Sequence, residues 1–303
     1  MSRYCSYHIT YVGGSMKHNV RKTRIFLDSG DPTETRKAQE MLGFLDGQTT
    51  NPTLVARNPA VQERLQRGEK FSNDEIFKFY KTVVGEISSL IPHGSVSVEV
   101  YADERTSAEE MFLHGRGMAL WIPNAHIKYP TTKEGLLAAD MSVGEGMRVN
   151  MTLVFAQEQA AAVYAATRVA KRGDVYVSPF VGRLDDRGEN GMDLIRNIIQ
   201  MYKKGDGHVE VLTASVRSLD HLMQAMALGS DIVSAPFGVL EEWAGKGMPI
   251  PGPEYSYKRD DLLDIPYDTI PLDKPWATYK IHHELTDKGI ERFSQDWNSL
   301  IGV

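Results

Sequence analysis

The stretch Ala125-His126-Ile127-Lys128-Tyr129-Pro130 is typical of a short buried strand that ends at a proline. Strand alternation makes Lys128 the last residue of this strand to point inward. A lysine at such a position costs several kcal/mol unless it is paired or neutral. A lysine that burial keeps neutral is a nucleophile that can form a Schiff base with a ketone. The alternative is a side chain that extends from the strand end into solvent.

Other short apolar runs along the chain share this pattern, and longer helical patterns separate them. Most runs recur every roughly 20 to 35 residues, which is the spacing of a strand–helix unit. Helical patterns cover residues 53–66, 73–91 and 156–171. The last of these ranges is rich in alanine, a strong helix former. A further apolar stripe lies between residues 194 and 202. The other expected strands are residues 24–28, 44–49, 95–100, 148–154, 175–181, 210–214 and 231–234.

Eight such units predict the α/β class, with residues 24–245 forming a single (β/α)8 TIM barrel. In that fold the functional residues lie at the C-terminal ends of the strands. A doubly wound open sheet is the structural alternative. No Gly-x-Gly-x-x-Gly loop follows the first run, which counts against a dinucleotide-binding version, and Gly144-Glu145-Gly146 is only a turn.

The two ends of the chain depart from this rhythm. Residues 1–23 are expected to be an N-terminal extension without the apolar stretch of a signal peptide, and Met16 is an alternative start. Residues 246–284 contain six of the 14 prolines and predict an ordered, irregular excursion. Residues 285–303 predict a C-terminal helix that packs on the barrel or on a neighbouring subunit of a homo-oligomer. Its apolar face combines Ile290, Phe293, Trp297, Leu300 and Ile301.

The composition excludes several classes of protein. The chain has 303 residues, of which 42% are hydrophobic and 24% charged, as in a globular protein that can bury a large core. A net charge of -6 gives no indication of nucleic-acid binding. No apolar run approaches the roughly 18 residues of a membrane helix. The single cysteine, Cys5, excludes an internal disulfide and fits a cytoplasmic location.

Polar residues follow the apolar runs where the strands should end. Taken singly, each has an ordinary explanation: Asp28 could cap a helix, Asn51 could start a turn before proline, and Arg183 could be a solvated surface charge. Taken together, carboxylates, a lysine, arginines and hydroxyls would meet at one mouth of a barrel. That inventory suits a phosphorylated, hydroxyl-rich substrate with a carbonyl. The candidates are Asp28, Asn51, Glu99, Lys128, Asn150, Thr152, Ser178, Phe180, Arg183, Ser215 and Arg217.

The chain resembles the transaldolases, members of the Schiff-base-forming class I aldolase superfamily, across roughly residues 24–240. The Thr-Thr-Asn-Pro and Ser-Pro-Phe-Val-Gly-Arg strings are the specific signals, and the tail Leu285-Thr286-Asp287-Lys288-Gly289 also looks like this family. Residues 1–23 and 246–284 have no counterpart in the resemblance. The segments that carry it are Phe26–Asp28, Asp46–Leu54, Val98–Val100, Ile127–Lys128, Asn150–Leu153, Ser178–Arg183 and Ala214–Arg217.

The resemblance implies transfer of a dihydroxyacetone unit in the pentose phosphate pathway, from sedoheptulose 7-phosphate or fructose 6-phosphate to an aldose phosphate. Lys128 would be the Schiff-base lysine, and Asp28 would take the proton from the C4 hydroxyl of the donor. Glu99 with Thr152 would hold a proton-shuttling water. The substrate-binding residues would be Asn51, Ser178 and Phe180, and for the phosphate Arg183, Ser215 and Arg217.

No cofactor and no metal are expected, because the iminium does the polarising. We expect no catalytic role for the histidines, and we expect His126 to point away from the barrel lumen. One alternative is a fructose 6-phosphate aldolase that releases free dihydroxyacetone. Such enzymes tend to carry glutamine and tyrosine where Glu99 and Phe180 stand, so these residues favour transfer. The other alternative is a non-enzymatic barrel that binds a sugar phosphate.

Overall fold

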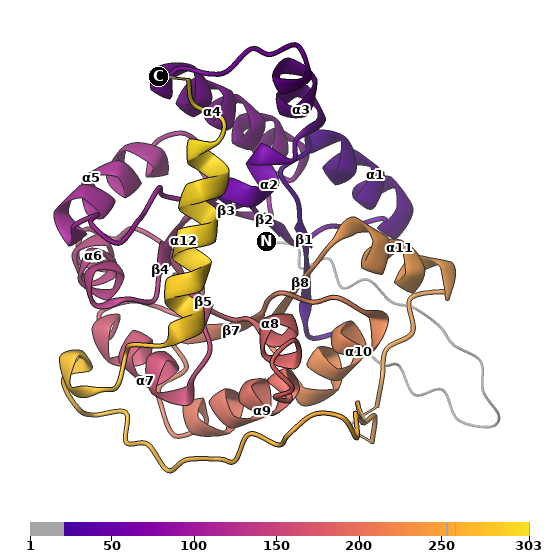
Figure 1. The fold of residues 1–303 in the computed structure, drawn as a ribbon. Helices are drawn as coiled ribbons and strands as arrows, with labels where there is room; N and C mark the ends of the chain where they lie inside the picture. Colours follow the sequence, from indigo (N-terminus) through magenta and orange to yellow (C-terminus); the bar gives the residue numbers. More distant parts are fainter. Residues whose placement is uncertain (1–20, 253, 258, 303) are drawn as a thin grey trace.

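The computed structural model describes residues 21–252, 254–257 and 259–302. Eight parallel strands form a closed barrel in the order β1 to β8, with helices around it (Figure 1). The expected N-terminal extension up to residue 20, with the alternative start at Met16, lies outside the described residues. The strands are β1 (Arg24–Asp28), β2 (Gly47–Thr49), β3 (Ser95–Glu99), β4 (Ala125–Pro130), β5 (Val149–Val154), β6 (Val175–Pro179), β7 (Val209–Thr213) and β8 (Ile232–Ala235).

The pairing of the first strand with the last closes the ring. β1 pairs with β2 on one side and with β8 on the other, where Arg24 lies opposite Ile232 and Leu27 opposite Ala235. A doubly wound sheet would leave two edge strands, whereas each of these eight strands has two neighbours. The predicted (β/α)8 barrel is therefore confirmed, and the open sheet is excluded.

Helices surround the barrel, and most begin at a polar cap. Ser72 and Ser107 each form a capping box with the glutamate three residues later, so that two backbone N–H groups find acceptors. The helices are α1 (Pro32–Leu42), α2 (Pro52–Ala56), α3 (Pro59–Gln66), α4 (Asn73–Leu90), α5 (Ala108–Ala119), α6 (Lys133–Gly144), α7 (Gln157–Ala166), α8 (Val181–Asp185), α9 (Gly191–Tyr202), α10 (Leu219–Leu228), α11 (Phe237–Gly245) and α12 (Glu284–Asn298), with the 3-10 turn η1 (Trp276–Thr278).

Several predicted boundaries were wrong by a few residues. The helical stretch expected over 53–66 is two helices, because Asn58 caps α3 and Pro59 occupies its first turn. The strand expected over 44–49 begins only at Gly47, after a turn that follows the left-handed Gly43. The strand expected over 175–181 ends at Pro179, and Val181 already starts α8.

His126 points into the barrel, so the prediction that it points away from the lumen was wrong. It is two residues from Lys128, and side chains two apart in a strand share a face. Its ring stacks on Tyr176 at 4.1 Å, and Tyr176 in turn meets Phe26 from the opposite wall of the barrel. Burial lowers the pKa of His126 to about 3, so the ring is neutral. This layer lies below Lys128 and is structural.

The last helix, α12, lies across the C-terminal mouth of the barrel, the end at which the strands terminate (Figure 1, yellow). Its Thr286 hydroxyl donates to the Leu153 carbonyl at 2.8 Å, and Gly289 packs directly against the Leu153 side chain. Gln159 donates to the same Thr286 hydroxyl at 2.9 Å. α12 thus packs on the barrel of its own chain, one of the two arrangements that the sequence left open.

Residues 246–284 connect α11 to α12 along the outside of the barrel, past α10, α9 and α7 (Figure 1, orange to yellow). The segment is held at points along its length, by Gln224 on α10, Asn197 on α9 and Gln157 on α7. Within the described residues η1 is its only helical turn. Across all the residues that the structure describes, no helix has the length and apolar character needed to cross a membrane.

Candidate active site

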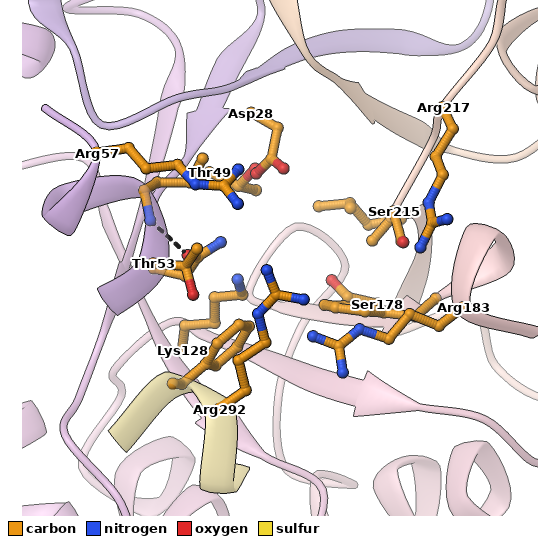
Figure 2. A pocket seen from close by; sticks show the side chains of 16 residues that line it. Asp28, Thr49, Thr53, Arg57, Lys128, Ser178, Arg183, Ser215, Arg217 and Arg292 are labelled. Carbon is orange, nitrogen blue, oxygen red and sulfur yellow. Dashed lines mark hydrogen bonds between the residues drawn. The ribbon is translucent and has the colours of Figure 1, made fainter. Parts of the chain in front are cut away.

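A cavity of about 180 Å³ opens at the C-terminal mouth, between the strand ends and α12 (Figure 2). Most of the site residues expected from the sequence line it. Glu99, Asn150 and Thr152 are the exceptions, and Glu99 contacts Lys128 from behind the cavity wall. The predicted residues that line the cavity are Asp28, Asn51, Lys128, Ser178, Phe180, Arg183, Ser215 and Arg217.

Lys128 forms a buried ion pair with Glu99. The two residues lie opposite each other on β4 and β3, so the pairing of the strands brings their side chains together. The Lys128 Nζ is 2.9 Å from a Glu99 carboxylate oxygen, and each side chain is only 4% exposed. Lys128 also donates to the Thr50 carbonyl at 3.3 Å. Burial raises the pKa of the Glu99 carboxyl, which the Lys128 charge partly offsets.

Asp28 is the second carboxylate near Lys128. It ends β1, and the hydroxyl of Thr49 on the neighbouring strand donates to it at 2.6 Å. Thr49 is itself 2.5 Å from the Ser234 hydroxyl of β8. Burial raises the pKa of Asp28, and the Lys128 charge, the Thr49 hydrogen bond and the Arg57 charge offset part of that rise. Lys128 thus has two carboxyls with raised pKa near it, the usual surroundings of groups that exchange protons.

Thr152 lies where β5 is irregular. The register between β5 and β6 shifts between Met151 and Val154, and Leu153 has a φ of 59°. A bulge of this kind changes the direction of nearby side chains and often adjoins an active site. Among the described residues the buried Thr152 hydroxyl has no hydrogen-bond partner. An unsatisfied buried hydroxyl costs about 1–3 kcal/mol, so this position is costly for stability alone.

Asn150 and Ser178 form a polar link between β5 and β6. The Ser178 hydroxyl donates to the Asn150 side chain at 2.6 Å, and Asn150 donates to Ser97 at 3.0 Å.

Asn51 caps α2, since its side chain accepts from the Leu54 N–H at 2.9 Å. Asn51 therefore both caps this helix and lines the cavity. Phe180 lines the cavity and packs edge-to-face on Phe155.

The guanidinium groups of Arg183 and Arg217 lie at the far side of the cavity from Asp28, that of Arg292 lies between them and Lys128, and that of Arg57 lies beside Asp28 (Figure 2). Arg183 lies on α8, and Arg217 follows β7 after Ser215, whose φ is 58°. A Cβ at Gly182 would lie 2.6 Å from the Arg217 Nε, so glycine there leaves room for this side chain. Burial lowers the pKa of Arg183, and the nearby charges of Arg292 and Arg217 lower it further. This concentration of positive charge suits a dianion such as phosphate.

The matching family model is that of transaldolase/fructose-6-phosphate aldolase, and it covers residues 25–303. The chain belongs to this family. A "probable transaldolase" of Dehalococcoides mccartyi (strain ATCC BAA-2266 / KCTC 15142 / 195) is 35% identical over 277 residues, which are 91% of this chain and 99% of that protein. A "probable transaldolase" of Caulobacter sp. (strain K31) is 36% identical over 276 residues, 90% of this chain and 96% of that protein.

Among solved structures, the 3-hexulose-6-phosphate synthase of Salmonella typhimurium is similar over 74% of this chain and 97% of that chain, with a TM-score of 0.46 and 13% identity. That likeness is too distant to carry an argument. The family and the names of the relatives indicate an enzyme of the transaldolase type. In the described part of this family member, His, Cys, Asp and Glu form no group of three or more that could hold a metal ion.

Some residues of the cavity wall were missed by the sequence reasoning. Arg292 and Phe293 come from α12, and only the apolar face of that helix gave a signal. Arg57 directly follows α2, five residues after the Thr-Thr-Asn-Pro string of the family, and Thr49 and Thr53 lie in or beside that string. The position of α12 across the mouth could not be read from the chain, so Arg292 had no apparent neighbour.

Proposed function

We propose that this protein is a transaldolase, which transfers a dihydroxyacetone unit from a ketose phosphate to an aldose phosphate through a Schiff base on Lys128. The observation that carries the proposal is the position of Lys128: buried, near two carboxyls with raised pKa, and facing a cavity whose other side is lined by arginines. Sedoheptulose 7-phosphate and fructose 6-phosphate are the donors that we propose, in the pentose phosphate pathway.

The covalent steps follow from the chemistry of an amine and a ketone. Lys128 gives a proton to Glu99, its neutral nitrogen adds to the C2 carbonyl of the donor, and loss of water from the carbinolamine gives an iminium. Asp28 removes the proton of the C4 hydroxyl, the C3–C4 bond breaks, and its electron pair moves into the iminium to give an enamine. The aldose leaves. The enamine then attacks the carbonyl of the acceptor aldose, Asp28 returns its proton to the oxygen of that carbonyl, and hydrolysis of the new iminium by water releases the product ketose and the lysine.

Proton transfer during carbinolamine formation and dehydration falls to Glu99. Its raised pKa suits a group that must both accept and return a proton near neutral pH. A water held between Glu99 and the Thr152 hydroxyl would carry the proton, and this role would account for the unsatisfied Thr152 hydroxyl. Asn51 and Ser178 would hydrogen-bond the hydroxyls of the three-carbon unit.

The phosphate of either substrate would bind Arg183 and Arg217, with Ser215 donating beside them. Planar guanidinium groups can bind phosphate oxygens through two parallel hydrogen bonds. The Asp28 side and the arginine side of the cavity are opposite each other, which suits a linear sugar whose reacting carbons and phosphate are several bonds apart (Figure 2). Arg292 adds a third positive charge at the arginine side.

Transfer is favoured over simple cleavage by the residues at two positions. The family's fructose 6-phosphate aldolases tend to have glutamine and tyrosine where this chain has Glu99 and Phe180. The Phe180 ring packs on Phe155 and offers no hydroxyl that could hold a water near the enamine. A longer-lived enamine waits for an aldose instead of being protonated.

Borohydride trapping with fructose 6-phosphate tests the proposal directly. We expect a reduced three-carbon adduct on Lys128, detected by intact-mass and peptide mass spectrometry, and no adduct in Lys128→Met. Product release that stops at one aldose per site without an acceptor would support transfer, whereas continuous release would favour the aldolase. A folded protein that forms no adduct, or forms it on another lysine, would refute the assignment.

A further inference from the structure

The excursion of residues 246–284 contacts α8, the helix that carries Arg183, through Tyr257. The Tyr257 hydroxyl donates to an Asp185 carboxylate oxygen at 3.0 Å. The His221 Nε2 lies 2.8 Å from the same oxygen and 3.0 Å from the Tyr257 hydroxyl. The rings of His221 and Tyr257 meet edge-to-face, with centroids 5.0 Å apart. His221, Asp185 and Tyr257 are called the His221 cluster below.

The other nitrogen of His221 holds the backbone of Arg217. The Arg217 N–H donates to the His221 Nδ1 at 3.3 Å, so Nδ1 is the acceptor of the ring. The neutral ring then carries its proton on Nε2 and donates it to Asp185. His221 and Asp185 are nearly buried, with side chains 4% and 10% exposed. A chain of hydrogen bonds therefore runs from the Arg217 backbone to the excursion.

Asp185 lies on the same short helix as Arg183. Its second carboxylate oxygen accepts from the Gly191 N–H at 3.0 Å, which fixes α8 against the start of α9. Burial raises the pKa of Asp185, but the hydrogen bonds from His221, Gly191 and Tyr257 together lower it more, so the carboxyl stays ionised and accepts from all three. The His221 cluster thus joins the two elements that carry Arg183 and Arg217.

These two guanidinium groups repel each other, and the Arg217 guanidinium pairs with Asp186, the residue that follows α8, with its Nη2 2.6 Å from a carboxylate oxygen. This ion pair holds the guanidinium, whereas the His221 cluster holds the backbone of Arg217 and fixes α8 against α9. We propose that the His221 cluster positions Arg183 and Arg217 at the separation that a substrate phosphate requires, and that the excursion supplies Tyr257 for this purpose. The inference rests on the proposed function, because it takes these arginines as the phosphate ligands. None of the three residues touches the substrate, so they are positioning residues.

The test compares Tyr257→Phe with Tyr255→Phe. Both substitutions remove one hydroxyl from the excursion, but the Tyr255 hydroxyl donates to Asp220 at 2.7 Å and lies outside the cluster. We expect Tyr257→Phe to raise the Kd of inorganic phosphate, measured by titration calorimetry, by about 3- to 10-fold, the equivalent of one hydrogen bond. Asp185→Asn, which keeps an oxygen for Gly191, should raise it at least as much.

Kinetics then distinguish positioning from a general loss of structure. The KM for glyceraldehyde 3-phosphate should rise with the phosphate Kd in Tyr257→Phe, while kcat and the KM for unphosphorylated glyceraldehyde stay within about twofold of the wild type. An unchanged phosphate Kd in Tyr257→Phe would overturn the inference, as would an equal effect of Tyr255→Phe or an equal rise of both KM values. Phosphate binding needs no turnover. A wild type that binds phosphate without transferring dihydroxyacetone would therefore overturn the proposed function alone.

Discussion

Substitution of Lys128 by methionine should make the stability of the protein depend on pH in a way that reports on Glu99. In the wild type the Lys128 charge lowers a Glu99 pKa that burial has raised. Without Lys128 that pKa rises further. A carboxyl whose pKa is higher in the folded state than in the unfolded state binds more protons when folded, so its contribution to stability falls as the pH rises between the two pKa values.

The magnitude follows from the burial of the pair. Removal of one partner of a buried ion pair costs about 3–5 kcal/mol when the other stays charged. Protonation of Glu99 avoids that cost at low pH. We therefore expect the stability difference between Lys128→Met and the wild type to be smallest at low pH. It should widen by up to about 1.4 kcal/mol per pH unit for each affected carboxyl, from the folded-state pKa of that carboxyl in the wild type up to its higher pKa in the variant. Asp28 adds to this slope, since Lys128 lowers its pKa too.

Urea unfolding followed by circular dichroism between pH 4.5 and 8 measures this slope. The matched variant is Lys128→Met with Glu99→Gln, in which the buried carboxyl is neutral at every pH. The second substitution should remove at least about half of the added slope and leave the part due to Asp28. The reasoning fails if Lys128→Met differs from the wild type by a constant amount across this range, or if Glu99→Gln leaves the slope unchanged.

Three further predictions concern α12 and the charges of the mouth. Arg292→Ala should raise the KM for phosphorylated substrates about 10-fold in steady-state assays, whereas Lys288→Ala, one turn earlier on the helix, should not. Gly289→Ala places a Cβ 2.6 Å from the Leu153 side chain and should lower the unfolding free energy by about 1–3 kcal/mol in urea, unlike Gly85→Ala, where a Cβ meets nothing within 4 Å. Finally, kcat/KM for phosphorylated substrates should fall several-fold between about 10 and 200 mM salt, with unphosphorylated substrates as the insensitive control.

The eight strands were predictable because each combines a short apolar run with a polar residue at its C-terminal end. Asp28, Lys128 and Ser178 stand at such ends, and a barrel brings the ends of all its strands to one mouth. Their grouping follows from the fold class alone. The boundaries failed where a local cap decided the outcome, as at Asn58, whose side chain starts a helix within an apparently continuous helical pattern.

Other features depend on contacts that the chain order does not contain. Arg292 reaches the cavity because α12 crosses the mouth, and that crossing depends on the fit of Gly289 against Leu153. The irregular backbone at Leu153 gives no signal in the sequence, since leucine rarely has a positive φ. The link from Tyr257 to Arg217 joins segments about 40 residues apart through His221. Nothing in the sequence around His221 distinguishes it from the other histidines.

The charges of the mouth combine binding and chemistry in one electrostatic field. Arg57 lies on the Asp28 side of the cavity and lowers the pKa of this proposed base, while Arg183, Arg217 and Arg292 lie on the other side. The cavity wall therefore carries five cationic side chains, Lys128 included, and one carboxylate, while Asp186 pairs with Arg217 from outside the wall. Because these groups share neighbours, their contributions should not be additive. Loss of Arg57 should affect both the ionisation of Asp28 and the attraction of the substrate. A lower activity after Arg57 is replaced is therefore evidence of a phosphate contact only if the pH profile of kcat stays unchanged.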